Sequence, residues 1–306
     1  MSVPFVPGVE EGVSLEGNIE ISADDLKHVA FVEDTSHGTG NIKQSGVSDF
    51  GDECFLLHGI LSNAECKFFI DEGEKLGFET IRGVRDDYRS CKRITIDSKE
   101  LASVLWSRIK PYVHDISVGD SPHDLHIHGP PSLMKGRWVP VGLNNIFRLC
   151  RYFPGGHFSP HFDGHYDASP SERSLKTFML YLNGGFSGGA TNFVDESQTL
   201  YKDVETGKYC AEEKNIICSV QPEAGLGILF NHHRLHEGAQ LKDGVKYILR
   251  TDIMFKNVDQ NVSEEYVKAV KFLQQAETLE NGGECMKAAE LYRRAFKLAP
   301  ELENSC

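Results

Sequence analysis

The sequence has no long apolar run, no CxxC cysteine pair and a deficit of positive charge. Its first residues, MSVPFVPGVEEGVSLEG, show no basic segment followed by an apolar one, and no window approaches the roughly 18 apolar residues of a membrane span. The 8 scattered cysteines suggest neither a cysteine-based zinc motif nor a small disulfide scaffold. We therefore expect no signal peptide or transmembrane segment, and reduced thiols in the cytoplasm or the nucleus.

The charge balance is acidic. The chain has 45 acidic and 32 basic residues, a net charge of -13, which repels phosphate backbones and anionic lipid surfaces. We therefore expect neither nucleic acid nor a membrane as a partner. Basic residues are concentrated in VRDDYRSCKR at 84–93. This segment is either an exposed loop of mixed charge or a mobile loop that receives substrate.

The composition is that of a folded protein. At 306 residues and 40% hydrophobic residues, the chain can form one large domain with an appendage, or two modest domains. Residues 1–48 are rich in turn formers and have weak periodicity, which predicts an irregular N-terminal arm. An apolar run of strand type, CFLLHGIL, follows this arm. It precedes two amphipathic helical patterns, SNAECKFFIDEGEKLGF and DSKELASVLWSRIKPYV.

Between residues 144 and 255 the pattern changes to short β-type runs separated by Gly, Pro, Asn and Asp. That spacing is typical of an antiparallel sandwich or barrel, so the fold class expected is α+β. A helical hairpin is then predicted over 262–303, with its turn at Asn281-Gly282-Gly283. Small and aromatic residues in it fall on the spacing of one tetratricopeptide unit, namely Ala276, Leu279, Ala288, Tyr292, Ala295 and Pro300.

A single tetratricopeptide unit cannot bury its apolar face alone. The hairpin would therefore pack on the β-rich domain, on a second copy or on a protein partner. An ordinary helical hairpin with coincidental spacing remains the alternative.

The stretch FSPHFDGHYD at 158–167 contains a candidate metal site. On an extended segment, residues two apart point to the same face, so His161 and Asp163 can contact one ion. A third ligand must come from elsewhere, and NHHRLHEG offers His232, His233 and His236. Two histidines and one carboxylate form the facial triad of non-haem Fe(II). The neighbouring His165 and Asp167 are alternative ligands.

Four sequence segments follow one another along the chain: RYFPGGHFSPHFDG, LKTFMLYLNGGFSGGATNF, PEAGLGILFNHHRLHEG and GVKYILRTDIMF. In this order they closely resemble the catalytic domain of the prolyl 4-hydroxylase family of Fe(II)- and 2-oxoglutarate-dependent dioxygenases. The resemblance implies a double-stranded β-helix (jelly-roll) core at 144–256, within a dioxygenase domain at 49–257 buttressed by N-terminal helices. It does not extend to the arm or to the hairpin.

The resemblance assigns roles to individual residues. It makes His161, Asp163 and His236 the metal ligands and catalytic residues. It makes Lys246 the cation for the 2-oxoglutarate C5 carboxylate, although Arg250 lies on the same strand face and could do this instead. Otherwise Arg250 would bind substrate or pair with an acid. The hydroxyl groups of Tyr152 and Thr177 would hydrogen-bond the cosubstrate.

The implied activity is hydroxylation of a C–H bond, with 2-oxoglutarate decarboxylated to succinate and CO2. Fe(II), O2 and 2-oxoglutarate are the implied cofactors, and ascorbate is a further candidate. The substrate expected is a prolyl residue in a peptide or protein, as in procollagen-proline 4-dioxygenases. The alternatives are another amino-acid residue or a small molecule, a non-catalytic β-helix module that binds partners through its hairpin, and a zinc hydrolase using the same triad.

Overall fold

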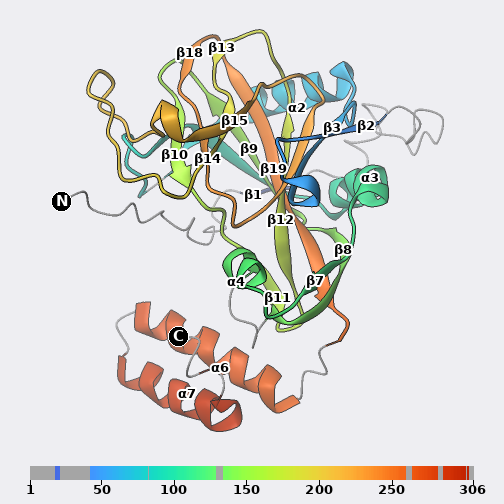
Figure 1. Ribbon diagram of the computed structural model, residues 1–306, viewed down its shortest axis with the longest axis vertical. Coiled ribbons are helices and arrows are strands. Elements are labelled where there is room, and N and C mark those ends of the chain that lie inside the picture. The colour runs from blue at the N-terminus through green and yellow to red at the C-terminus, as the bar shows by residue number, and fades with distance from the viewer. Residues whose placement is uncertain are drawn as a thin grey trace. The chain divides into compact units, whose positions relative to one another are not determined.

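The structure is a computed structural model that describes residues 18–20, 42–81, 83–128, 134–259, 264–281, 285–300 and 302. Its chain divides into two compact units, which we describe separately. The first comprises residues 1–114, 141–165 and 174–254, and the second comprises residues 115–140, 166–173 and 255–306. Figure 1 gives the labels of the elements used below.

A large sheet forms one layer of the first unit. Its strand order is β1-β6-β9-β19-β12-β16-β3-β2, and β4 pairs with β6 at the side. The pairs β6–β9, β9–β19, β12–β16, β16–β3 and β3–β2 are antiparallel. The strands are β1 (Asn18–Glu20), β2 (Lys43–Gly46), β3 (Cys54–His58), β4 (Glu79–Thr80), β6 (Lys92–Asp97), β9 (Ile146–Tyr152), β12 (Glu172–Tyr181), β16 (Gly227–Asn231) and β19 (Lys246–Asn257).

A smaller antiparallel sheet forms the second layer, in the order β15-β14-β17-β10-β5. Its strands are β5 (Arg89–Ser90), β10 (His157–His161), β14 (Thr191–Val194), β15 (Ile216–Val220) and β17 (His236–Gly238). A separate two-stranded sheet pairs β13 (Ser187–Gly188) with β18 (Leu241–Asp243). The expected β-rich region with mostly antiparallel sheets is therefore confirmed.

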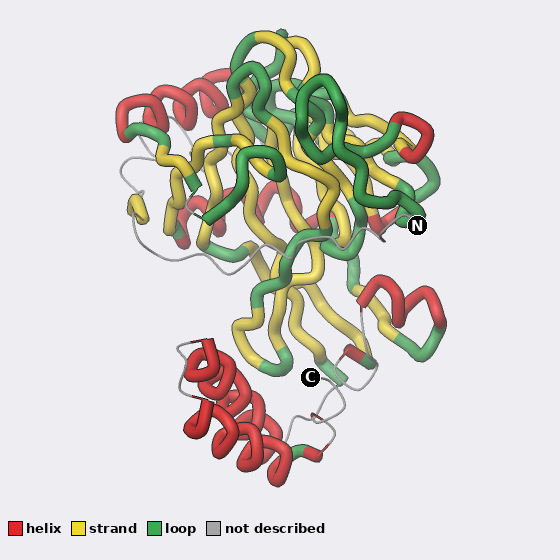
Figure 2. Tube along the Cα trace, turned by 90° about the vertical axis from the view of Figure 1, so that its left-hand side faces the viewer, coloured by secondary structure: helices red, strands yellow, loops and turns green. Residues whose placement is uncertain are grey.

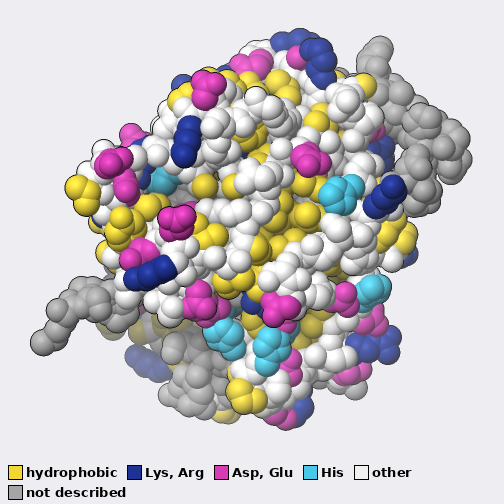
Figure 3. All heavy atoms as spheres, turned by 45° about the horizontal axis from the view of Figure 1, so that its top comes forward, with side chains coloured by type: hydrophobic (Ala, Val, Ile, Leu, Met, Phe, Trp, Pro, Cys, Tyr) yellow, Lys and Arg dark blue, Asp and Glu magenta, His cyan; other side chains and the backbone are white. Residues whose placement is uncertain are grey.

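The core of the first unit lies between the two sheets. Tyr152, Met179, Tyr181 and Ile248 of the large sheet belong to one buried cluster with Phe193 of the small sheet. This packing follows from period-two alternation, which turns every second side chain of each strand inward. Figure 3 shows, on the face it draws, hydrophobic side chains gathered near the centre, with charged side chains and histidines around them.

Helix α2 (Asn63–Leu76) covers the outer face of β9. Gly73 lies against Leu149, and Glu74 Oε2 accepts a hydrogen bond from Arg151 Nη1 at 2.6 Å. The helix starts at a capping box in which Ser62 and Glu65 satisfy each other's backbone N–H groups. The predicted strand CFLLHGIL and this helix are both present. Short 3-10 helices precede β3 (Gly51–Glu53) and occur before β15 (Glu213–Asn215).

Helix α3 (Lys99–Ile109) lies beside α2. Its N-cap is Ser98, and the buried face carries Leu101, Leu105 and Ile109. Arg108 Nη2 donates to Glu65 Oε1 of α2 at 2.7 Å. A 3-10 turn, Lys110–Tyr112, ends the segment where proline interrupts the helix. Both N-terminal helices expected from the sequence therefore form and support the large sheet.

The N-terminal arm is less irregular than expected where the structure describes it. Residues 18–20 form β1, which pairs in parallel with β6, and residues 43–46 form β2, which pairs with β3. The segment KQSG of β2 has no apolar alternation, so its extended form follows from backbone hydrogen bonds to a sheet edge rather than from its side chains. The rest of the expected arm, residues 1–17 and 21–41, lies outside the described residues.

The second unit contains β7 (Ile116–Val118), α4 (Pro122–His128), β11 (Asp167–Ser169), part of β8 (Gly136–Leu143), and the helices α6 (Glu264–Asn281) and α7 (Cys285–Leu298). Helices α6 and α7 lie side by side in both ribbon views (Figure 1, Figure 2). Five alanines among the described residues of the hairpin are almost fully buried: Ala269, Ala276, Ala288, Ala295 and Ala299. The predicted hairpin is therefore present, although Gly282 and Gly283 of its expected turn lie outside the described residues.

Among the helices that the structure describes, none combines the length and the apolar character needed to cross a bilayer.

Gly225 provides a test of the backbone packing between this glycine and Leu61. Its φ is +79°, and a Cβ added there would lie 2.1 Å from the carbonyl oxygen of Leu61. We predict that Gly225→Ala lowers the free energy of unfolding by about 3 kcal/mol, because left-handed strain and a backbone clash add. Denaturant-induced unfolding measures this change.

Gly207→Ala is the matched control. Gly207 also has a left-handed φ, +67°, but nothing lies within 4 Å of the added Cβ. This variant should lose only about 1 kcal/mol. Equal losses in the two variants would refute the close approach of Gly225 to Leu61.

Candidate metal centre

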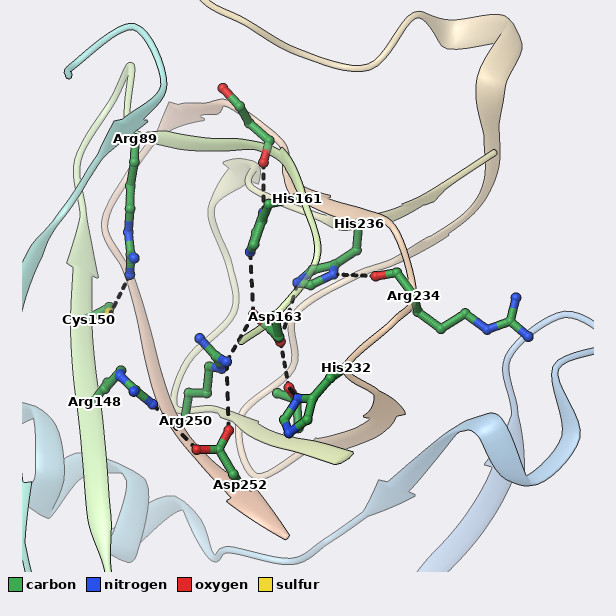
Figure 4. Close-up of polar contacts among 12 residues, drawn as sticks. Arg89, Arg148, Cys150, His161, Asp163, His232, Arg234, His236, Arg250 and Asp252 are labelled. Carbon is green, nitrogen blue, oxygen red and sulfur yellow. Dashed lines mark hydrogen bonds and ion pairs between the residues drawn. The ribbon is translucent and has the colours of Figure 1, made fainter. Parts of the chain in front are cut away.

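Three of the residues predicted to bind a metal meet at the small sheet. His161 ends β10 and His236 begins β17, and the register of these two strands pairs them directly. Asp163 lies two residues beyond His161, and its carboxylate faces both rings (Figure 4). The Nε2 atoms of His161 and His236 lie 3.6 and 3.7 Å from the carboxylate oxygens of Asp163. One potential ligand atom from each residue lies within 4.8 Å of the other two.

The hydrogen bonds of the two imidazoles direct their lone pairs to this point. His161 Nδ1 lies 2.7 Å from the carbonyl oxygen of Ser159, and His236 Nδ1 lies 2.8 Å from that of Arg234. A carbonyl oxygen can only accept, so Nδ1 of each ring donates and Nε2 carries the lone pair. Burial and the nearby His161 lower the pKa of His236 to about 3, which keeps this imidazole neutral.

Asp163 completes the cluster as a buried carboxylate. Burial alone would raise its pKa, but Arg250, His236 and His161 hold it well below the usual range. Its Oδ1 is buried and receives no hydrogen bond from the described residues, although Arg250 Nη2 lies 2.9 Å away as an ion-pair partner. Two imidazole lone pairs and an ionised carboxylate fit a divalent cation of the Fe(II) or zinc type.

The alternative ligands lie elsewhere. His165 and Asp167 are exposed, and Asp167 pairs with Arg173 at 2.9 Å. Within the described chain, neither belongs to the cluster of His161, Asp163 and His236. His233 stacks on Phe162, with ring centroids 4.4 Å apart.

Thr177 and His232 form hydrogen bonds that support the carboxylate of Asp163. Thr177 Oγ1 donates to Asp163 Oδ2 at 2.5 Å and lies 3.0 Å from His232 Nδ1, and His232 Nε2 lies 2.9 Å from Ser174 Oγ. We expected Thr177 to hydrogen-bond a cosubstrate, but the structure places its hydroxyl against the carboxylate of Asp163. Alternation along β12 identifies the inward face correctly, but it does not show which inward residue lies under the cluster.

The cluster opens into a pocket between the two sheets. Lys246 and Arg250 both line it, as expected for two residues on one face of β19. Lys246 Nζ donates to the carbonyl oxygen of Gly189 at 2.6 Å and lies 5.3 Å from the ring centroid of Tyr152. Burial lowers the pKa of Lys246 to about 8. Tyr152 also lines the pocket, and Arg250 pairs with Asp163, one of the roles expected for it.

Sequence reasoning did not identify two polar residues at the Lys246 end. Tyr181 donates its hydroxyl hydrogen to Thr191 Oγ1 at 2.7 Å, and Lys246 Nζ lies 5.8 Å from the Tyr181 ring centroid. Thr191 lines the pocket. Alternation in KTFMLYL, which puts Tyr181 on the inward face with Met179, was the available signal.

The basic segment at 84–93 contributes Arg89 to the lining of the pocket. Its strand β5 pairs with β10, and Ser159 donates its N–H to the carbonyl oxygen of Tyr88 at 2.8 Å. Lys202 Nζ forms an ion pair with Asp87 at 3.0 Å. The guanidinium group of Arg89 lies 4.2 Å from the ring centroid of Phe158 and lines the pocket. The expected mobile loop is thus tied to the small sheet by backbone hydrogen bonds.

Comparison with known families identifies this region. Residues 147–251 match the family model of the 2OG-Fe(II) oxygenase superfamily. This region of the chain is similar to that superfamily. The family implies Fe(II) and 2-oxoglutarate, and the cluster of His161, Asp163 and His236 supplies suitable ligands for the metal. The matched segment contains all three of these residues.

A hydroxylase is also similar to part of this chain. A PKHD-type hydroxylase of Prochlorococcus marinus (strain NATL2A) is 22% identical over 196 residues, which cover 63% of this chain and 75% of that protein. The family match and this relative confirm the resemblance to prolyl hydroxylases of the superfamily.

Two solved structures are also similar. The viral collagen prolyl hydroxylase of Paramecium Bursaria Chlorella virus-1, in its 2OG complex, has 20% identity and a TM-score of 0.39, covering 68% of this chain and 99% of that one. A Pseudomonas putida prolyl-4-hydroxylase has 15% identity and a TM-score of 0.39, covering 66% of this chain and 91% of that one.

Thr177 provides a test of the metal centre. Thr177→Val keeps the shape of the side chain but removes the hydrogen bond to Asp163. We predict a 10- to 100-fold weaker affinity for Fe(II) or Co(II), because an unsupported carboxylate is a poorer and less oriented ligand. Anaerobic metal titration measures this affinity. Thr191→Val, which changes a pocket hydroxyl away from the carboxylate, should bind metal as the unmodified protein does. Unchanged affinity in Thr177→Val would exclude the supporting role.

Proposed function

We propose that the protein is an Fe(II)- and 2-oxoglutarate-dependent dioxygenase that hydroxylates a prolyl residue. The observation that carries the proposal is the convergence of two imidazoles and one buried carboxylate at the wall of a pocket that also contains a buried lysine. We interpret the two packed antiparallel sheets as its double-stranded β-helix, with the dioxygenase domain at 49–257 and its core at 144–256. The hairpin at 262–303 is proposed as a tetratricopeptide-like appendage that binds a protein partner.

In this proposal His161, Asp163 and His236 hold the metal from one side. Three protein ligands leave the remaining coordination positions free for cosubstrate and oxygen. A bound Fe(II) would activate O2, which is the oxidant: two electrons come from 2-oxoglutarate as it becomes succinate and CO2, and two from the C–H bond that is hydroxylated. The hydrogen bonds to Ser159 and Arg234 fix the orientation of both imidazoles.

Lys246 is the proposed partner of the distal carboxylate of 2-oxoglutarate. It is buried, lines the same pocket as the cluster, and lies beside the ring of Tyr152, whose hydroxyl would donate to the same group. A charge-assisted hydrogen bond in a pocket of low polarity is strong, because water does not compete for either group. Arg250 remains the alternative, but its contact with Asp163 places it at the metal end.

Aromatic side chains restrict access of water to the ligands. Phe158 stacks on His161 with ring centroids 3.5 Å apart, and Phe230 packs edge-on against His236 at 4.6 Å. These contacts hold both rings in place, and both histidines are buried. The prolyl substrate itself is supported by the order of sequence motifs and by the hydroxylase relative.

The choice of His236 can be tested by metal binding. Anaerobic addition of Fe(II) and 2-oxoglutarate should give a weak metal-to-ligand charge-transfer band in the visible region. His236→Ala should abolish this band, whereas His233→Ala should retain it, because His233 stacks on Phe162 outside the cluster. Loss of the band in both variants, or in neither, would contradict the assignment. Absence of the band in the folded unmodified protein would exclude the dioxygenase proposal.

The role of Lys246 predicts a pH dependence. Below its pKa of about 8 the lysine is protonated and binds a carboxylate, and above this pH it loses its charge. The dissociation constant of 2-oxoglutarate should therefore rise as the pH increases from 7 to 9, by up to 10-fold per unit above the pKa. Anaerobic equilibrium dialysis of the Fe(II)-loaded protein measures this constant.

Two variants at the same position serve as controls. Lys246→Arg keeps its charge over this pH range, so its dissociation constant should not change with pH. Lys246→Ala should bind 2-oxoglutarate weakly at every pH. The assignment fails if the unmodified protein shows no change in the dissociation constant between pH 7 and 9.

A further inference from the structure

Two arginines face each other across the large sheet, inside the pocket. The register of β9 and β19 places Arg148 directly opposite Arg250, and both side chains line the pocket. Like charges directly opposite each other destabilise a sheet. A pair of this kind needs an anion between the two guanidinium groups.

Arg250 has a close partner in Asp163, at 2.9 Å, but the acidic group shared by the two arginines is held only loosely. Asp252 lies between the arginines (Figure 4), with Oδ2 3.7 Å from Arg148 Nη1 and Oδ1 3.7 Å from Arg250 Nη2. Both distances exceed the range of a hydrogen bond. Within the described residues, Asp252 Oδ1 and two nitrogens of Arg148, Nε and Nη1, are buried and have no hydrogen-bond partner. Buried polar groups left in this state cost free energy until a ligand satisfies them.

The charges that line the pocket are unequal. Its lining contains four cationic side chains, Arg89, Arg148, Lys246 and Arg250, and two acidic ones, Asp163 and Glu237. Glu237 is occupied, since it accepts hydrogen bonds from the Asn192 side chain and from the Ala211 N–H, both at 2.7 Å. Under the proposed function, the metal occupies Asp163 and 2-oxoglutarate occupies Lys246. Arg148, whose Nε and Nη1 have no hydrogen-bond partner among the described residues, can then bind one more anion beside Arg250.

We propose that Arg148 and Arg250 bind the α-carboxylate of the substrate, which is therefore free proline or a peptide that ends in proline. This inference rests on the proposed function and specifies its substrate. Two guanidinium groups can hold a carboxylate through several charge-assisted hydrogen bonds at once.

The position of the arginine pair indicates that the bound carboxylate belongs to the hydroxylated residue itself and not to an acidic residue next to it in the substrate. Arg250 Nη2 is only 2.9 Å from Asp163 Oδ1, so an anion bound to Arg250 lies next to the metal ligands. The carboxylate must therefore be only a few bonds from the carbon that reacts. The α-carboxylate of proline meets this condition, whereas the side chain of a following acidic residue is several bonds further away.

The test compares two probes that differ only in this charge. The protein, loaded with Fe(II) and 2-oxoglutarate under argon, is titrated in a calorimeter with N-acetyl-L-proline and with N-acetyl-L-prolinamide. We expect the acid to bind at least 10-fold more tightly than the amide. In Arg148→Gln this preference should fall to 2-fold or less. Equal binding of the two probes to the unmodified protein, or binding of neither, would overturn the inference.

Two further variants separate charge recognition from general damage. Arg151→Gln removes an arginine from the same strand, but Arg151 points to the outer face and pairs with Glu74, so the preference for the acid should persist. Arg148→Lys keeps the positive charge but loses the planar guanidinium group, which can donate two parallel hydrogen bonds to a carboxylate. This variant should retain an intermediate preference for the acid over the amide. Loss of the preference in Arg151→Gln to the same extent as in Arg148→Gln would indicate a structural effect and contradict the inference.

The cosubstrate is the other possible source of a carboxylate at this position. If Arg148 held 2-oxoglutarate, Arg148→Gln would raise the dissociation constant of 2-oxoglutarate as much as Lys246→Ala does, and the inference would fail. We expect that constant to change less than 2-fold in Arg148→Gln. The charge-transfer band distinguishes failure of this inference from failure of the proposed function. A normal band without a preference for the acid rejects this inference alone, whereas absence of the band rejects the proposed function.

Discussion

The register of β10 against β17 is the constraint on which the rest of the site depends. It places His161 opposite His236, although many residues separate them in the chain, and the backbone carbonyls of the same segments fix the tautomer of each ring. A slip of one residue in this pairing would turn one imidazole to the other face of the sheet. The proposed metal centre is therefore specified by strand pairing before any contact with a ligand.

Asp163 links the two sheets. Its backbone follows β10 of the small sheet, but its carboxylate contacts Thr177 on β12 and Arg250 on β19, both in the large sheet. The positive charge of Arg250 offsets the cost of burying this carboxylate and keeps it ionised, as a metal ligand must be. Arg250 consequently contributes both to the electrostatics of the metal centre and to the arginine pair with Arg148.

Much of this arrangement could be predicted from the sequence, and its limits have physical causes. Alternation in FSPHFDG was sufficient to place His161 and Asp163 on one face, and alternation in KYILR placed Lys246 and Arg250 together. The resemblance assigned Thr177 to the cosubstrate, and its hydrogen bond to Asp163 was not foreseen, because alternation gives the face of a side chain but not its depth along the strand. The pairing of Arg148 with Arg250 depends on the register of two distant strands, which local sequence does not determine. Short edge strands such as β2 were missed because backbone pairing, not side-chain pattern, makes them extended.

The carboxylate of Asp163 also has a mechanical consequence. The histidines come from the small sheet, and the groups that support the carboxylate come from the large one. A cation bound by His161, Asp163 and His236 would therefore connect the small sheet to the large sheet. Folding and metal uptake would then be thermodynamically linked, because an ion that binds only the folded chain stabilises it in proportion to RT ln(1 + [M]/Kd). The melting temperature of the protein would accordingly depend on metal concentration, even when no reaction takes place.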